Sequence, residues 1–171
     1  MITLRQESGK DFTDITRVND LAFGRKAESR LVHALRKTED FIPELSIVAE
    51  TDGQLVGHIL FYPVVIKGKN SHFGSLTLAP MSVLPDWQKK SIGKLLVIYG
   101  LETARGLGHT SSVVLGHPSY YTKFGFRPAS TWNIRSPFPA PDESFMAVEL
   151  EKGALKDVSG KVEFPKAFEG L

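Results

Sequence analysis

The stretch VLPDWQKKSIGK, residues 83–94, decides the fold of this chain. It predicts the end of a strand, a tight turn and the start of a helix. A helix start leaves about four backbone N–H groups unpaired, and the helix dipole adds partial positive charge there. The stretch therefore predicts a site for a phosphate or pyrophosphate. An ordinary helix start with solvated lysines explains the same residues.

Several side chains of this stretch suit an anion. Gly93 lets the backbone come close to a ligand, Lys89, Lys90 and Lys94 add positive charge, and Ser91 is small and can donate its hydroxyl. The spacing matches neither the phosphate loop GxxxxGK[ST] nor the dinucleotide fingerprint GxGxxG. The sequence thus indicates an anion site of another type.

The residues before this turn predict mainly strands. Leu45–Glu50 is apolar, and Asp52-Gly53 is a hairpin turn before the β-rich run Leu55–Ile66. A further strand, Phe73–Leu84, contains Pro80, which cannot donate to a sheet ladder, so the strand should bulge or open there. Together these segments predict an antiparallel meander.

Helices surround this meander in the sequence. Apolar spacing predicts helices near residues 12–22 and 27–37 and a mostly buried one within Gln88–Leu107. Ser111–Leu115 is the next strand, which makes a strand–helix–strand unit that should be parallel and right-handed. A short helix should start at Pro118, and Met146–Leu150 is a late strand. The fold class is α/β.

Bulk composition fits one globular domain over residues 1–171, with 42% hydrophobic residues. The 21 basic and 19 acidic residues leave a net charge of +2, too balanced to indicate a nucleic-acid surface. There is no cysteine, and no His/Asp/Glu cluster has metal-ligand spacing, so no metal is expected. No window reaches the roughly 18 apolar residues of a membrane helix, and no signal-like segment is present, so a cytoplasmic location without membrane contact is expected.

Two motifs resemble one known family. The hexamer QKKSIG, residues 88–93, is similar to the [Q/R]-x-x-G-x-[G/A] acetyl-CoA loop of the Gcn5-related N-acetyltransferases (GNAT), with Ser91 in place of the first glycine. The pattern V-x-P, which commonly precedes that loop, is present at Val83 and Pro85. YYTKFGF, residues 120–126, resembles the [F/Y]-Y-x-K-x-G-F segment of the same family.

The resemblance covers nearly the whole chain and points to the YhbS-like branch of predicted acetyltransferases. LSIVAE (45–50), LGHP (115–118) and FMAVEL (145–150) carry it outside the two motifs. It implies a single-domain GNAT fold, with a mixed, mostly antiparallel sheet of about six or seven strands and helices on both faces. It also implies acetyl-CoA as co-substrate and direct transfer of the acetyl group to an amine.

By this resemblance the cofactor lies along the strand end, the loop and the second motif. Backbone groups of Met81, Ser82 and Val83 would pair with the pantetheine amides, although core packing also explains these residues. The complete set of expected cofactor-binding residues is Met81, Ser82, Val83, Gln88, Lys89, Lys90, Ser91, Ile92, Gly93, Lys94 and Phe124.

Tyr121 matches the usual general acid of the family. Attack of an amine on a thioester expels a thiolate, and a phenol with a pKa near 10 is still protonated at neutral pH and can donate to that sulfur. The alternative is a structural tyrosine packed on the cofactor. For the base that deprotonates the amine, Glu50, His58, His117 and bulk water are open, with a histidine on a strand more often structural.

The sequence therefore predicts an acetyl-CoA-dependent N-acetyltransferase. The acceptor is left open among a small-molecule amine, a protein N-terminus and a lysine, and a homodimer is also left open. A non-catalytic acyl-CoA sensor of the same fold is the first alternative. Association with RNA or the ribosome through the Lys/Arg-rich surface is the second, and the mixed charges give it little support.

Overall fold

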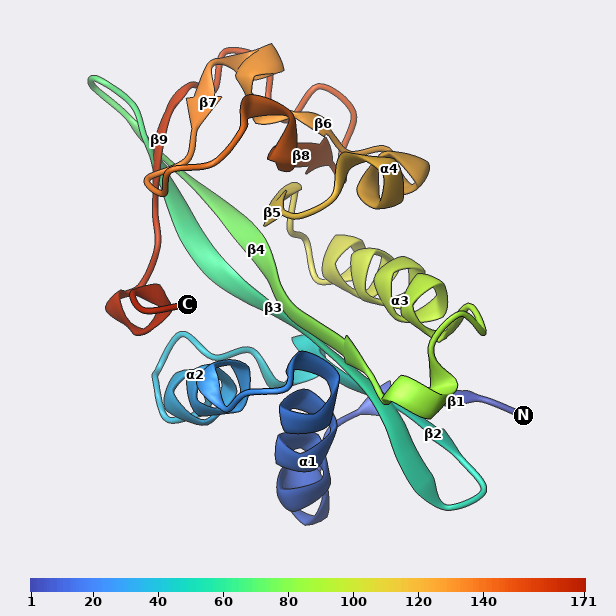
Figure 1. The fold of residues 1–171 in the computed structure, drawn as a ribbon. Coiled ribbons are helices and arrows are strands. Elements are labelled where there is room, and N and C mark those ends of the chain that lie inside the picture. Colours follow the sequence, from blue (N-terminus) through green and yellow to red (C-terminus); the bar gives the residue numbers. More distant parts are fainter. The chain divides into compact units, whose positions relative to one another are not determined.

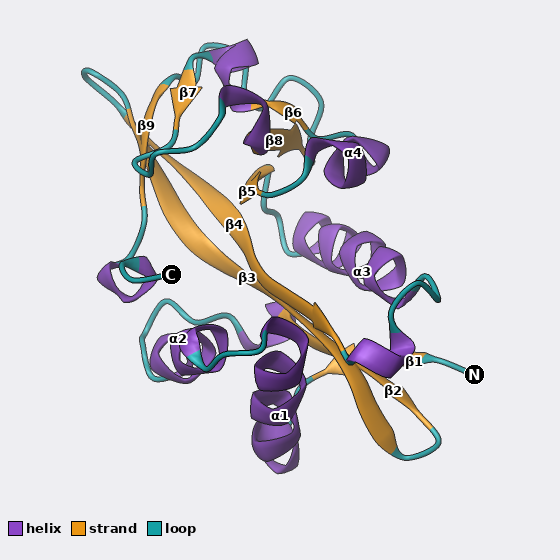
Figure 2. Ribbon diagram, viewed as in Figure 1, coloured by secondary structure: helices purple, strands orange, loops and turns teal.

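The computed structural model describes residues 1–171 and contains four α-helices and nine strands (Figures 1 and 2). Two compact units make up the chain. The first unit comprises Met1–Tyr62, Ala79–Thr103 and Lys166–Leu171, and the second comprises Pro63–Leu78 and Ala104–Pro165. Strands β3 (Gln54–Lys67) and β4 (His72–Val83) each contribute residues to both units.

The first unit contains antiparallel strands, among them the first two strands of the predicted meander. Strand β1 (Thr3–Gln6) pairs with β2 (Ser46–Thr51), and β2 pairs with β3, both antiparallel. The hairpin turn between β2 and β3 has φ values of 51° at Asp52 and 73° at Gly53. Two positive φ values match the turn that the Asp-Gly pair predicted, so this prediction is confirmed.

Helices cover both faces of β3 within the first unit (Figure 1). Helix α3 (Ile92–Gly106) lies on the face of Gly57 and Phe61, because a Cβ on Gly57 would contact Leu96 and the Phe61 ring contacts Gly100. The side chain of His58 points to the opposite face of the sheet, where it contacts Asn19 of α1 (Phe12–Phe23). Tyr62 bonds Thr38, just after α2 (Ala27–Arg36), at 2.6 Å. The prediction of helices on both faces is therefore confirmed.

Helix α3 is less buried than its sequence suggested. Leu96 and Val97 are fully buried, whereas Leu95, Ile98 and Tyr99 are 40–44% exposed. A helix turns by about 100° per residue, so an unbroken apolar run places some side chains outward. The helix itself is confirmed, and its burial is confined to one face.

The second unit holds the remaining strands. Strand β4 pairs in parallel with β5 (Ser111–Leu115), which confirms the predicted parallel pair. Strand β8 (Phe145–Glu149) pairs antiparallel with β5 and with β6 (Arg127–Pro128). Strand β9 (Gly160–Glu163) pairs with β3, and β7 (Ile134–Arg135) with β9. The count of nine strands exceeds the predicted six or seven, because two-residue strands such as β6 and β7 leave no periodic pattern.

Helix α4 (Pro118–Tyr121) begins at the predicted proline. A 3₁₀ turn, Thr122–Phe124, continues it and ends at Gly125 with φ 92°. Glycine adopts this left-handed conformation without steric cost, which explains the predicted stop.

Gly100→Ala should lower the free energy of unfolding by about 1–3 kcal/mol, because a methyl group there would overlap the Phe61 ring. The matched control is Gly106→Ala in the same helix, where no atom lies within 4 Å; it should raise stability by up to about 1 kcal/mol. Urea unfolding of both variants measures the difference. An unchanged Gly100→Ala midpoint would contradict tight packing of α3 on β3.

Candidate functional site

The turn between β4 and α3 is held by hydrogen bonds to neighbouring strands. Leu84 donates its N–H to the carbonyl oxygen of Val56 at 2.8 Å, and Trp87 donates to Leu84 at 2.8 Å. The side-chain Nε2 of Gln88 donates to the carbonyl oxygen of Val83 at 3.0 Å. Gln88 therefore braces the turn against the end of β4.

Six consecutive N–H groups beyond this brace, those of Lys89–Lys94, have no acceptor in the protein. The first backbone bond of α3 runs from Leu95 to the carbonyl oxygen of Ser91, at 3.1 Å. Lys89 and Ser91 have left-handed φ values of 62° and 66°. Such alternation lets successive N–H groups converge, and the helix dipole adds positive potential. The turn therefore presents a run of free backbone N–H groups of the kind that suits an anion. We call residues 89–94 the cradle.

Ser91 stands in a backbone conformation that favours glycine. Its φ of 66° costs a residue with a Cβ about 1 kcal/mol. The glycine usual at this position of the motif would adopt it freely. The departure noted in the sequence thus affects backbone strain as well as space, and only the structure reveals the strain.

The end of β4 offers a free donor. Ser82 is 3% exposed, and its Oγ has no hydrogen-bond partner. A buried hydroxyl without a partner is rare in a folded protein and fits a polar group of a ligand. Met81 is half-buried and Val83 buried, so both also pack as the core-packing alternative expected.

Tyr121 and Phe124 belong to the second unit, in an aromatic cluster at the end of β5. The Tyr121 ring lies edge-on to Tyr120 at 5.0 Å and to Phe126 at 5.7 Å, and tilted to Phe124 at 6.5 Å. Burial, with a smaller contribution from Tyr120, raises the pKa of Tyr121 to about 12. Its phenol therefore stays protonated over the whole neutral and mildly alkaline range.

Sequence reasoning missed two neighbours of this tyrosine. A Cβ on Gly116 would lie 2.5 Å from Cε2 of Tyr121, and the Phe126 ring centroid lies 5.7 Å from that of Tyr121. The signal for Gly116 was its place in the LGHP segment, but a glycine in a strand-to-helix loop does not reveal which ring it accommodates.

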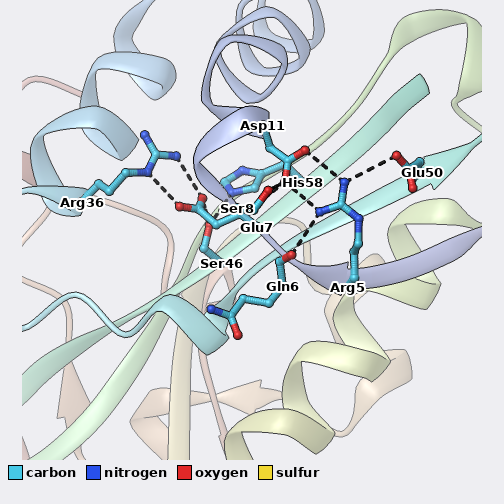
Figure 3. Close-up of polar contacts among 9 residues, drawn as sticks. All are labelled: Arg5, Gln6, Glu7, Ser8, Asp11, Arg36, Ser46, Glu50 and His58. Carbon is cyan, nitrogen blue, oxygen red and sulfur yellow. Dashed lines mark hydrogen bonds and ion pairs between the residues drawn. The ribbon is translucent and has the colours of Figure 1, made fainter. Parts of the chain in front are cut away.

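His58, a candidate base, is a core residue with no exposed surface. Figure 3 shows its ring among the polar side chains around Glu7. Asn19 donates Nδ2–H to the Ile15 carbonyl at 3.0 Å and lies 3.3 Å from Nδ1 of His58, which assigns the proton to Nε2. His58 Nε2–H then donates to Oγ of Ser46 at 3.0 Å.

The chain of bonds continues to an ion pair. Ser46 donates to Glu7, whose carboxylate accepts two bonds from Arg36 at 2.8 and 2.9 Å. Burial, reinforced by the charge of Arg36, lowers the pKa of His58 to about 3. His58 is thus a neutral, hydrogen-bonded structural residue, as a histidine on a strand more often is.

The other two candidate bases differ in access to solvent. Glu50 is half-buried and lies 3.4 Å from Arg5. Arg5 also pairs with Asp11 at 2.7 Å and lowers the pKa of that carboxyl to about 2. His117, in the second unit just before α4, is exposed. Of the three side chains, that of His117 is the one that forms no hydrogen bond or ion pair with another residue.

No group of three or more His, Cys, Asp or Glu side chains lies close enough to hold a metal ion. None of the helices combines the length and the apolar character needed to cross a membrane.

Comparison with known proteins gives the family. The Acetyltransferase (GNAT) domain family matches residues 43–128. The chain is 38% identical to the uncharacterized N-acetyltransferase YjhQ of Escherichia coli K12 over 134 residues, which are 78% of this chain and 74% of YjhQ. It is 33% identical to the uncharacterized N-acetyltransferase YhbS of the same strain over 148 residues, 86% of each chain. The chain therefore belongs to the GNAT acetyltransferase family, as its motifs predicted.

Two solved structures resemble the whole chain. The E. coli YhbS structure in complex with CoA has a TM-score of 0.90 and 30% identity, covering 98% of this chain and 91% of that one. A GNAT acetyltransferase from Brucella melitensis in complex with acetyl-CoA has a TM-score of 0.80 and 33% identity, covering 99% of both chains. The predicted GNAT fold and YhbS-like branch are thus confirmed.

His58→Gln should flatten the pH dependence of stability. The folded-state pKa of about 3, against an ordinary 6.5, means that unfolding takes up a proton at His58 between these pH values. Stability associated with His58 is complete above pH 6.5 and declines as the pH falls towards 3.

The slope of the unfolding free energy against pH should therefore be smaller in the variant, by up to about 1.4 kcal/mol per pH unit between about pH 6 and 4. Urea unfolding at several pH values measures this slope, with exposed His33→Gln as control. Equal slopes for wild type and His58→Gln would contradict a neutral buried histidine.

Ser91→Gly should raise the free energy of unfolding by about 1 kcal/mol, because glycine relieves the left-handed φ. Ser91→Ala removes only the hydroxyl and keeps the strain, so it should show no such gain. Paired urea unfolding curves separate the two effects. A gain of equal size in Ser91→Ala would point to the hydroxyl rather than to the backbone.

Proposed function

We propose that this protein transfers an acetyl group from acetyl-CoA directly to a primary amine of a small molecule or peptide. The observation that carries the proposal is the run of unpartnered N–H groups at Lys89–Lys94, at the start of α3 in a GNAT chain. A pyrophosphate supplies acceptor oxygens for such groups. The relatives solved with CoA and acetyl-CoA support the same ligand here.

The residues expected to bind acetyl-CoA fit it. Three exposed lysines, Lys89, Lys90 and Lys94, add positive charge around the free N–H groups. The run of free N–H groups also includes those of Ser91, Ile92 and Gly93. Gln88 would act by bracing the turn. The buried hydroxyl of Ser82 has no partner and can donate a hydrogen bond to the cofactor. The backbone of Met81–Val83 would form hydrogen bonds with the pantetheine amides. Phe124 would offer an aromatic face.

Tyr121 is proposed as the general acid. The amine nitrogen bonds to the thioester carbonyl carbon, and the carbon–sulfur bond breaks with its electron pair passing to sulfur. The phenol gives its proton to that sulfur and later regains one from solvent, while the amine loses its proton to water or a base such as His117. Burial makes the phenol a weaker acid, so its proton moves only as charge builds on the sulfur.

The proposal includes one N-acetyltransferase domain over residues 1–171, supported by the YhbS structure that covers 98% of the chain. No cysteine is available as a nucleophile, which favours direct transfer over a thioester on the enzyme. A cytoplasmic location stays a prediction, and a homodimer stays open.

The proposed activity is tested by release of free CoA thiol with three acceptors. These are spermidine, a peptide with a free N-terminus and blocked lysines, and an N-terminally blocked lysine peptide. Turnover with one of them is expected. Tight acetyl-CoA binding without turnover on any amine would favour the acyl-CoA sensor instead.

Tyr121→Phe should reduce kcat by about tenfold or more, in the range for loss of a general acid. Acetyl-CoA affinity should stay within about twofold, because the ring remains in place, and exposed Tyr99→Phe is the matched control. With a pKa of about 12, the protonated phenol is retained as pH rises, so wild-type kcat should not fall between pH 8 and 10 through this group. Full activity in Tyr121→Phe would remove it from the mechanism.

A further inference from the structure

The phenol oxygen of Tyr121 has no hydrogen-bond partner in the protein. A hydroxyl that no hydrogen bond holds is placed only by the packing of its ring. The rings of Tyr120 and Phe126 contact it edge-on, at 84° and 75° to its plane, and the Phe124 ring lies tilted to it at 57°. One more contact comes from a glycine.

The contact with this glycine is a contact with backbone. Gly116 follows β5, and a Cβ there would lie 2.5 Å from Cε2 and 3.0 Å from Cδ2 of Tyr121. Real Cβ atoms do not approach a ring so closely, so the ring occupies the space of the missing side chain. The backbone N–H of Gly116 donates to the Ser144 carbonyl oxygen at 2.9 Å, which ties the glycine to the segment before β8.

The glycine is not required by backbone conformation. The φ of Gly116 lies outside the left-handed region, so alanine could adopt the same backbone and keep the bond to Ser144. The one obstacle to a side chain at position 116 is the Tyr121 ring. An alanine there therefore acts through Tyr121.

We propose that Gly116 is a positioning residue for the Tyr121 phenol: its bare backbone lets the ring pack against the end of β5 and so sets where the hydroxyl points. The inference rests on the proposed function, in which that hydroxyl is the acid. Gly116 itself touches no reacting atom.

The packing is tested by stability in four variants. Gly116→Ala should lower Tm by about 3–10 °C in wild type and in Tyr121→Phe, which keeps the ring. In Tyr121→Ala the added methyl has free space, so Gly116→Ala should cause no further loss. Gly74→Ala, with no atom within 4 Å and no left-handed φ, is the matched control in the same unit. An equal penalty in the Tyr121→Ala background would overturn the proposal.

The positioning is tested by kinetics on whichever of the three acceptors turns over. Gly116→Ala should lower kcat by about fivefold or more, with the acceptor KM within about twofold, and should cause no further loss in Tyr121→Phe. A double variant whose loss in kcat is the product of the two single losses would overturn the proposal. So would full kcat in Gly116→Ala while Tyr121→Phe is impaired.

A readout free of activity separates failure of this inference from failure of the proposed function. With ring-¹³C tyrosine, the Tyr121 NMR signals, identified by their loss in Tyr121→Phe, should shift in Gly116→Ala and stay unchanged in Gly74→Ala. If no amine is acetylated by wild type, the proposed function fails and the acid role fails with it. The stability and NMR comparisons still decide whether Gly116 determines the position of the Tyr121 ring. Unshifted Tyr121 signals in Gly116→Ala would overturn that positioning role as well.

Discussion

Backbone N–H groups at a helix start need acceptors, and the first unit is built so that the protein supplies none to residues 89–94. The left-handed φ values at Lys89 and Ser91 let successive N–H groups converge. Gln88 and Leu84 tie the turn to β4 and β3. These hydrogen bonds hold the turn that carries the cradle.

The same cradle depends on how closely α3 approaches β3. A Cβ on Gly57 would lie 3.0 Å from Leu96 and 3.2 Å from Ile92, so the glycine lets the first turns of the helix rest on the strand. Because backbone rather than side chains forms the cradle, its chemistry tolerates exchange of single side chains. This explains how Ser91 can replace a glycine at the cost of local strain rather than of the binding groups.

Polar groups in the two units are placed by opposite means. The first unit places His58 with hydrogen bonds that run from Asn19 to the Glu7–Arg36 ion pair. Such a buried ion pair is costly to break from one side, which makes these residues structural. In the second unit, the Tyr121 hydroxyl is placed by rings and by a bare stretch of backbone. A group held by packing keeps its bonding capacity free for a substrate, whereas a group held by hydrogen bonds does not.

The sequence by itself determined the local elements, the family and the position of the cradle. The Asp-Gly hairpin, the Pro85–Gly93 turn and the short helix from Pro118 each depend on residues close in the chain, so turn and capping preferences sufficed. Only the tertiary structure decided that His58 is buried and neutral, that Ser91 is left-handed, that α3 keeps an exposed face, and that Gly116 makes room for Tyr121. These properties depend on neighbours distant in sequence or on the backbone path between elements. Burial, and the pKa shifts that follow from it, arise when those neighbours exclude water, and no local pattern of residues records that.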